Sequence, residues 1–314
     1  EKEINRQHWH QNDPGVVPNM LITGAGSPTG ILVYEGELLP KLYQNQIIHT
    51  DAGPKVVRAY PTTKNGAGYN ATMVNLIEGK DDWFRPSDLC VAPDGSLFVA
   101  DWYDAGVGGH QRADLTHGRI YRVTTAKKPN YKTNKLDVSS PETAVEALKS
   151  PNMATRYLAW NAIKSFSSKA EKPLYTMLSS SNARFRARAY WALVNIEGKS
   201  KKYIAKALTD VNEDVRIVAI RMARQTEKDY LPILQKLAKD NSPQIRREVA
   251  IALRHLPYSA EAANLWADLA LQYDGKDRWY LEALGIGAHD NWKSYFAAWK
   301  AKIGNNWNSP AGKD

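Results

Sequence analysis

The sequence predicts a chain of two unlike parts, an antiparallel β region followed by an α-solenoid. In residues 1–125, short apolar runs bounded by Gly, Pro and polar residues recur about every 10 residues, as the strands of a sandwich or propeller do. After residue 141 the apolar positions follow a helical period, and a 30-residue repeat begins. The charge changes with the period. Residues 1–125 contain 11 Lys and Arg against 14 Asp and Glu, whereas residues 126–314 contain 31 against 19.

Six segments of the first part have the apolar and β-branched composition of strands, namely residues 31–34, 46–49, 56–60, 89–92, 97–100 and 118–123. The clearest hairpin joins the fourth and fifth of these segments. Its turn is Pro93-Asp94-Gly95-Ser96, and the Asp-Gly pair supplies the positive φ angles that a tight primed turn requires.

Residues 126–140 are rich in Lys, Thr, Asn and Ser and have no periodic pattern, so we expect a linker there. Beyond it, arginines recur every 30 residues, and each follows an Asn or Ser by four positions. Asn and Ser favour helix N-caps, and a helix pair repeated at a fixed period predicts an α-solenoid over residues 141–314. The arginines are Arg156, Arg186, Arg216 and Arg246, and the caps are Asn152, Asn182, Asn212 and Ser242.

Leucines 30 residues apart are expected to close the first helix of each pair, at Leu148, Leu178 and Leu208. We expect the repeated arginines to bridge neighbouring repeats. Contacts between this basic row and the phosphates of a nucleic acid are the less favoured alternative.

The composition excludes several classes of protein and site. Hydrophobic residues make up 43% and charged residues 24%, as in ordinary globular chains. The sequence contains no apolar run of about 18 residues, so it predicts no transmembrane helix. The single cysteine, Cys90, excludes an internal disulfide, a CxxC zinc site and a CxxCH haem attachment. The chain begins at Glu1 without a signal-peptide pattern, as a mature or trimmed product would.

A glycine-rich loop between two predicted strands holds the densest group of polar side chains. Carboxylates and carbonyls in such a loop suit Ca²⁺, and a histidine beside a carboxylate can act as a general base. The alternative is a structural loop whose Asp side chains accept its own backbone N–H groups. We expect these candidate ligands to converge at one end of the β region, with Arg85 on the neighbouring strands. They are Asp101, Asp104, His110, Asp114 and His117.

Several short sequence segments are similar to segments of known families. They are residues 27–30, 33–36, 84–89, 92–97, 100–104, 108–110 and 118–123. On these segments the β part resembles the closing blades of glucose/sorbosone dehydrogenase-like propellers. The helical part resembles HEAT/armadillo-type repeats over roughly residues 141–300. Together they resemble the large membrane-bound dehydrogenase-like proteins, which join a propeller, HEAT repeats and a c-type cytochrome module.

This resemblance implies a partial β-propeller over residues 1–125 and the cofactors pyrroloquinoline quinone and Ca²⁺, with no haem in this chain. In the similar sugar dehydrogenases an Arg-x-Arg-Asp pattern meets the quinone. Arg85 and Asp88 match its first Arg and its Asp, and they are therefore the candidate cofactor-binding residues. The chain departs from the pattern at Ser87, in place of the second Arg, and at Ala52, in place of a quinone-contacting lysine.

A closed propeller needs four or more blades of about 40–45 residues, and residues 1–125 supply roughly three. We therefore expect a fragment, or a chain that pairs with another, and no activity from this chain alone. The resemblance implies a protein of the periplasm or outer face of a bacterial envelope that oxidises a sugar or polyol. Its electrons would pass to a cytochrome module outside this chain, with the HEAT part as docking scaffold. The alternative is a non-catalytic scaffold with a degenerate propeller that binds glycan or protein.

Overall fold

A computed structural model of the chain describes residues 19–24, 26–107, 116–126, 133 and 135–314. The chain forms two compact units. The β unit consists of Met20–Thr63 and Asn70–Ser165, and the helical unit contains Lys64–Tyr69 and Phe166–Asp314. The first helix pair therefore belongs to the β unit, although the predicted solenoid begins at residue 141.

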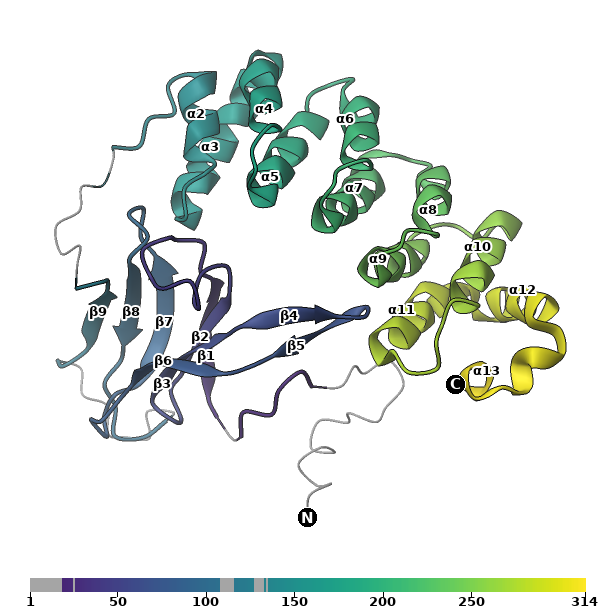
Figure 1. Cartoon of the computed structure of the whole chain (residues 1–314). Helices are drawn as coiled ribbons and strands as arrows, with labels where there is room; N and C mark the ends of the chain where they lie inside the picture. The colour runs from purple at the N-terminus through teal and green to yellow at the C-terminus, as the bar shows by residue number, and fades with distance from the viewer. Residues whose placement is uncertain (1–18, 25, 108–115, 127–132, 134) are drawn as a thin grey trace. The chain divides into compact units, whose positions relative to one another are not determined.

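The strands of the chain are short and antiparallel, and Figure 1 shows their succession. They are β1 (Pro28–Val33), β2 (Ile47–Asp51), β3 (Val56–Tyr60), β4 (Thr62–Asn65), β5 (Gly68–Ala71), β6 (Val74–Glu78), β7 (Pro86–Val91), β8 (Leu97–Asp101) and β9 (Arg119–Val123). All six predicted strand segments are confirmed. β4, β5 and β6 are additional strands that the sequence pattern did not predict.

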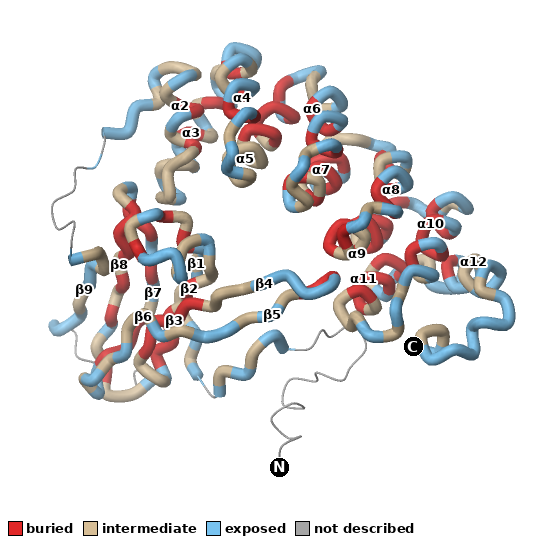
Figure 2. The backbone as a smooth tube through the Cα atoms, viewed as in Figure 1, coloured by how far each residue is buried: buried red, intermediate tan, exposed pale blue. Residues whose placement is uncertain are grey.

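These strands form a four-stranded sheet in the order β1-β2-β3-β6, a three-stranded sheet in the order β7-β8-β9, and the separate hairpin β4-β5. β1 and β2 pack against β7, so the two larger sheets share one core. Figure 2 shows that burial concentrates in β2, β3, β7 and β8. The expected three blades are thus two packed sheets and a hairpin among the described residues. The propeller stays a prediction.

Apolar side chains that alternate along the strands form this shared core. Ile48 of β2 and Val57 of β3 meet Leu89 of β7 and Val99 of β8 in one buried cluster. Tyr34 closes one end of it, because its fully buried hydroxyl donates to the carbonyl of Gly95 over 2.6 Å. Burial raises the pKa of Tyr34. The tyrosine therefore ties the end of β1 to the β7-β8 turn.

That turn differs from the predicted one. Gly95 has φ of +86°, but Asp94 does not adopt a positive φ, so the turn is not of the primed type. The N–H of Gly95 donates to Ala92 over 2.9 Å, and Ala92 donates to Ser96 over 2.8 Å. This is a three-residue loop with glycine in the left-handed position. The side chain of Asp94 accepts from Ser96 instead of supplying a second positive φ.

From Pro141 to the C-terminus the chain is mainly helical. The helices are α2 (Pro141–Ala147), α3 (Met153–Phe166), α4 (Glu171–Met177), α5 (Ala183–Val194), α6 (Ser200–Ala207), α7 (Glu213–Thr226), α8 (Leu231–Leu237), α9 (Pro243–Leu253), α10 (Ala260–Ala270), α11 (Arg278–Ala288), α12 (Trp292–Ile303) and α13 (Pro310–Lys313). The predicted N-caps are confirmed: Asn182, Asn212 and Ser242 precede α5, α7 and α9, and Asn152 accepts from Thr155 in α3. Leu148, Leu178 and Leu208 stand at the ends of α2, α4 and α6, as expected.

The second helices of the pairs form a row in the helical unit, since α5, α7, α9 and α11 contact one another in succession. Arginines bridge the repeats along this row. Arg186 forms a bidentate ion pair with Asp210 of the next repeat, and Arg216 repeats it with Asp240. In all four repeats the same Nη1 atom donates to the carbonyl six residues earlier. The equivalent placement is confirmed for all four arginines, and the bridging role is confirmed for Arg186 and Arg216.

Candidate functional site

The predicted loop begins with Asp101 at the end of β8, and its side chain is fully buried. One carboxylate oxygen accepts the backbone N–H groups of Arg85, over 2.8 Å, and Tyr103, over 3.0 Å. The other accepts from Arg119 Nε over 2.8 Å and lies 2.7 Å from Nη2. These donors occupy both oxygens of Asp101, which therefore joins two strands and the loop.

Asp104 and Arg85 also make contacts within the loop. Asp104 is buried, and its side chain accepts the N–H of Gly106 over 3.0 Å. The Arg85 guanidinium donates to the carbonyls of Phe84 and Ala105, both over 3.1 Å. Its Nε is buried without a hydrogen-bond partner. Arg85, Asp101 and Asp104 thus do converge, but around the backbone of the loop.

The other predicted ligands lie apart from this group or outside the described residues. Asp88 is exposed on β7, where its carboxylate accepts the adjacent N–H of Leu89. His117 is exposed, contacts Thr116 and lies 6.1 Å from the ring of Tyr103. His110 and Asp114 fall outside the described residues.

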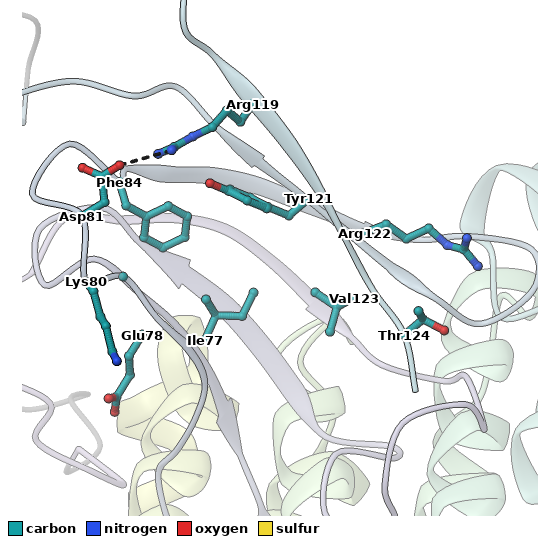
Figure 3. A pocket seen from close by; sticks show the side chains of 11 residues that line it. Ile77, Glu78, Lys80, Asp81, Phe84, Arg119, Tyr121, Arg122, Val123 and Thr124 are labelled. Carbon is teal, nitrogen blue, oxygen red and sulfur yellow. Dashed lines mark hydrogen bonds and ion pairs between the residues drawn. The ribbon is translucent and has the colours of Figure 1, made fainter. Parts of the chain in front are cut away.

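An open groove of about 600 Å³ lies next to Asp101 in the β unit (Figure 3). β6, the β6-β7 connection and β9 provide its lining, and β6 and β9 each end the strand order of their sheet. The apolar lining residues are Ile77, Phe84, Tyr121 and Val123, and the polar ones are Glu78, Lys80, Asp81, Arg119, Arg122 and Thr124. The volume lies in the range of small-molecule sites, although this lining carries more polar side chains than most such sites.

The groove presents an aromatic pair. Phe84 is buried, and its ring meets that of Tyr121 edge to face at 5.9 Å between centroids. Tyr121 keeps 37% of its surface exposed, which leaves part of its ring open to a ligand. Burial of the rest raises the pKa of Tyr121, so the hydroxyl stays protonated at neutral pH and can donate a hydrogen bond.

Arg119 is one of three positively charged residues that line the groove, with Lys80 and Arg122. Although burial opposes its charge, the hydrogen bond with Asp101 raises the pKa of the Arg119 guanidinium. Nη1 also lies 3.2 Å from Asp81, and the guanidinium stands 4.1 Å from the ring centroid of Tyr103. Asp101 thus positions Arg119 beside the groove. A predicted ligand residue is in this structure a positioning residue.

A second polar cluster, which the sequence analysis missed, lies on β2 and β3. His49 Nε2 and Arg58 Nη1 each lie 3.9 Å from the same carboxylate oxygen of Asp51. Burial lowers the pKa of His49, with Arg58 acting in the same direction, so the imidazole is neutral at pH 7. His49 Nδ1 and Arg58 Nη1 are buried without hydrogen-bond partners.

The described residues do not fit the cofactors that the resemblance implies. A quinone cradle would need Arg85 and Asp88 to face one site, but the Arg85 guanidinium binds the loop backbone and Asp88 is exposed on its strand. Ala52 is fully buried, and Ser87 donates to the carbonyl of Ala100. Within the described ranges, no three His, Cys, Asp or Glu side chains are arranged to hold a metal ion such as Ca²⁺.

The groove could not be found from the sequence, because its aromatic and apolar side chains come from strands more than 40 positions apart, such as Ile77 and Tyr121. The one usable signal was the alternation of Arg119, Tyr121 and Val123, which places these side chains on one face of a strand.

Two family models match separate parts of the chain. A domain of unknown function (DUF7133) matches residues 3–127. A search of the curated proteins gives no match. No helix of the part that the structure describes is long and apolar enough to cross a membrane. The HEAT-repeat family matches residues 141–221 and 201–285, and with the paired helices and the repeated arginines this identifies the helical part as HEAT repeats.

Proposed function

We propose that this chain is a non-catalytic binding scaffold. Its β unit would bind a sugar or polyol in the groove between β6 and β9, and its HEAT repeats would dock a protein partner. The observation that carries the proposal is the exposed face of Tyr121 in a groove with charged groups on its border. An aromatic ring covers the apolar face of a sugar, while charged and hydroxyl groups bind its OH groups.

The chemistry of the neighbouring loop favours binding over catalysis. A general base needs a carboxylate or imidazole with a lone pair facing the substrate. Both oxygens of Asp101 accept from protein donors, and Asp104 is buried and accepts from the loop backbone. Arg119 can still donate, because its side chain is 35% exposed. The two carboxylates that line the groove also accept from protein donors, Asp81 from Trp83 and Arg119, and Glu78 from Asn75. Beside these acceptors the groove offers donors and an aromatic surface.

The test is a calorimetric titration of the chain with a panel of neutral mono- and oligosaccharides. For a sugar that binds, Tyr121→Ala should weaken the affinity about tenfold, because an aromatic contact contributes about 0.5–1.5 kcal/mol beyond its buried area. Tyr258→Ala is the matched control, since Tyr258 is an exposed tyrosine of the helical unit. Equal affinities of Tyr121→Ala and wild type, or no binding by any sugar of the panel, would contradict the proposal.

The His49 cluster favours a second candidate, a dehydrogenase-like complete protein of the bacterial periplasm or outer cell surface that contains this chain. A neutral imidazole beside Asp51 has the composition of an acid–base site. Quinone and Ca²⁺ would then depend on residues outside the described ranges, and the electrons would pass to a cytochrome module. Dye reduction with aldoses, quinone and Ca²⁺ should be absent from this chain and present in the complete protein. In the complete protein, the change His49→Gln should abolish this dye reduction. Full activity of His49→Gln would exclude this role.

A further inference from the structure

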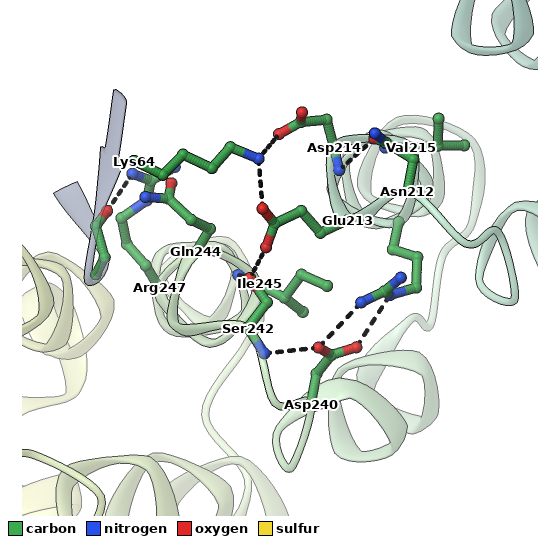
Figure 4. A network of polar contacts seen from close by, with 12 residues as sticks. Lys64, Asn212, Glu213, Asp214, Val215, Asp240, Ser242, Gln244, Ile245 and Arg247 are labelled. Atoms are coloured by element: carbon green, nitrogen blue, oxygen red, sulfur yellow. Dashed lines mark hydrogen bonds and ion pairs between the residues drawn. The ribbon is translucent and has the colours of Figure 1, made fainter. Parts of the chain in front are cut away.

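The tip of the β4-β5 hairpin, Lys64–Tyr69, belongs to the helical unit. Figure 4 shows it beside side chains of α7 and α9. Asp277, the N-cap of α11, also contacts it. The tip has the sequence Lys-Asn-Gly-Ala-Gly-Tyr and is held by contacts of three kinds.

The first kind of contact binds the backbone of the turn. Gln244 Nε2 donates to the carbonyls of Gly66, over 3.0 Å, and Gly68, over 2.7 Å. Arg247 Nη1 donates to the carbonyl of Ala67 over 2.5 Å, and the N–H of Ala67 donates to Asp277 over 2.6 Å. Three successive carbonyls and one N–H of the turn therefore have side-chain partners on the helices.

The second kind of contact admits only glycine at two positions. Gly66 has φ of +55°, and a Cβ atom there would meet the carboxylate of Asp277. A Cβ atom at Gly68 would meet the indole ring of Trp279. Any other residue would have to displace these groups, so the helices select a Gly-X-Gly turn.

The third kind of contact binds the lysine that precedes the turn. Lys64 Nζ lies 2.6 Å from a carboxylate oxygen of Glu213 and 2.7 Å from one of Asp214. Burial opposes the charge of Lys64, but the hydrogen bonds with these two carboxylates dominate and raise its pKa. The other oxygen of Glu213 is held by the hydroxyl of Ser242, which fixes the carboxylate toward the lysine.

The side chains that bind the turn are built into the helices. With the turn in place, Gln244 is 1% exposed and Arg247 is 9% exposed, and burial of such polar groups is costly unless they are hydrogen-bonded. In this structure the turn supplies the bonds of both donors. If the turn left the site, these donors would lose their hydrogen bonds unless another segment or water replaced the turn.

We propose that α7, α9 and α11 form a recognition site for a lysine-preceded Gly-X-Gly turn, which residues 64–69 occupy in cis. A protein partner that carries such a turn would bind the same site when the tip leaves it. The contacts involve backbone groups, two glycines and one lysine, so an external turn with these features can make all of them. The tethered tip competes at a high effective concentration and thereby regulates access. This proposal is independent of sugar binding by the groove.

The probe is a fluorescein-labelled peptide of residues 62–72, titrated by fluorescence anisotropy into three full-length chains. Wild type should bind it weakly because the tip competes. Gly68→Val, which displaces the tip, should bind it at least tenfold more tightly. Gly68→Val with Arg247→Ala should lose that gain. The same peptide with its own Gly68→Val change is the negative control and should not bind.

Circular dichroism establishes that each variant is folded. If Gly68→Val does not fold, Lys64→Glu serves in its place, because Glu213 and Asp214 would repel the new carboxylate. The proposal is overturned if the folded tip variant binds the peptide no more tightly than wild type. It is equally overturned if the Arg247→Ala change leaves the gained affinity intact.

Discussion

At the scale of single residues, the polar side chains of the predicted metal- or ligand-binding loop support the fold and position a neighbour. Asp101 accepts from two backbone N–H groups and from Arg119, and Arg119 in turn borders the groove. A buried carboxylate that accepts from this many donors mainly stabilises the fold. Its contribution to a binding site is indirect, through the guanidinium that it holds.

Replacement of Asp101 by Ala should therefore destabilise the β unit. The change leaves two N–H groups and part of the Arg119 guanidinium without acceptors, and hydrogen bonds to charged groups contribute about 1.5–3 kcal/mol each. We expect a loss of at least about 3 kcal/mol in urea unfolding followed by tryptophan fluorescence. Asp82→Ala is the control, because Asp82 is 90% exposed and pairs only with Lys55 among the described contacts. Similar losses in both variants would refute the structural role of Asp101.

The pH dependence of stability should show the contribution of Glu171 in the helical unit. Hydrogen bonds from Tyr203 and from Lys199 lower the pKa of Glu171 from 4.5 to about 2. Since this pKa is lower in the folded state, the stabilisation is complete above pH 4.5 and is lost as the pH falls toward 2. The difference in unfolding free energy between wild type and Glu171→Gln should shrink over that range. Glu197→Gln, at an exposed position, is the control. A constant difference would contradict the assignment.

At the scale of elements, two successive junctions between HEAT repeats are each joined by an ion pair at the same repeat position, Arg186 with Asp210 and Arg216 with Asp240. Arg216 bonds to Asp240, 24 residues later, with both Nε and Nη2. At Arg246 the corresponding position is Ala270, and Arg246 Nε has no hydrogen-bond partner. The ladder therefore ends at this repeat, where the arginine instead stands 5.9 Å from the ring centroid of Tyr280.

This difference makes the two arginines a natural comparison. Arg216→Ala should be less stable than Arg246→Ala by about 1.5–3 kcal/mol, because it also leaves the half-buried carboxylate of Asp240 without its charged partner. Urea unfolding followed by helical circular dichroism measures both variants. If the two variants lost the same amount of unfolding free energy, the contact with the preceding carbonyls, which both arginines share, would account for the contribution of both.

At the scale of the whole molecule, patterns with a fixed period were predictable and long-range encounters were not. The solenoid was predictable because caps and arginines recur every 30 residues. The hairpin β4-β5 was missed, since Thr62-Thr63-Lys64-Asn65 has no apolar alternation and its tip is held by helices far along the chain. In the site, Asp101 was identified as a candidate, but its partner Arg119 and the aromatic pair of Phe84 and Tyr121 meet only through the pairing and packing of strands.

The central claim is that the β unit binds a sugar-type ligand in the groove. Backbone amide chemical-shift mapping on the isotope-labelled chain, during titration with a sugar that binds, tests it most directly. The shifts should concentrate on residues 77–81, 84, 119 and 121–124, which line the groove, and on the aromatic resonances of Tyr121. Shifts confined to residues 101–106 or to the surroundings of His49 would place the ligand elsewhere and contradict the claim.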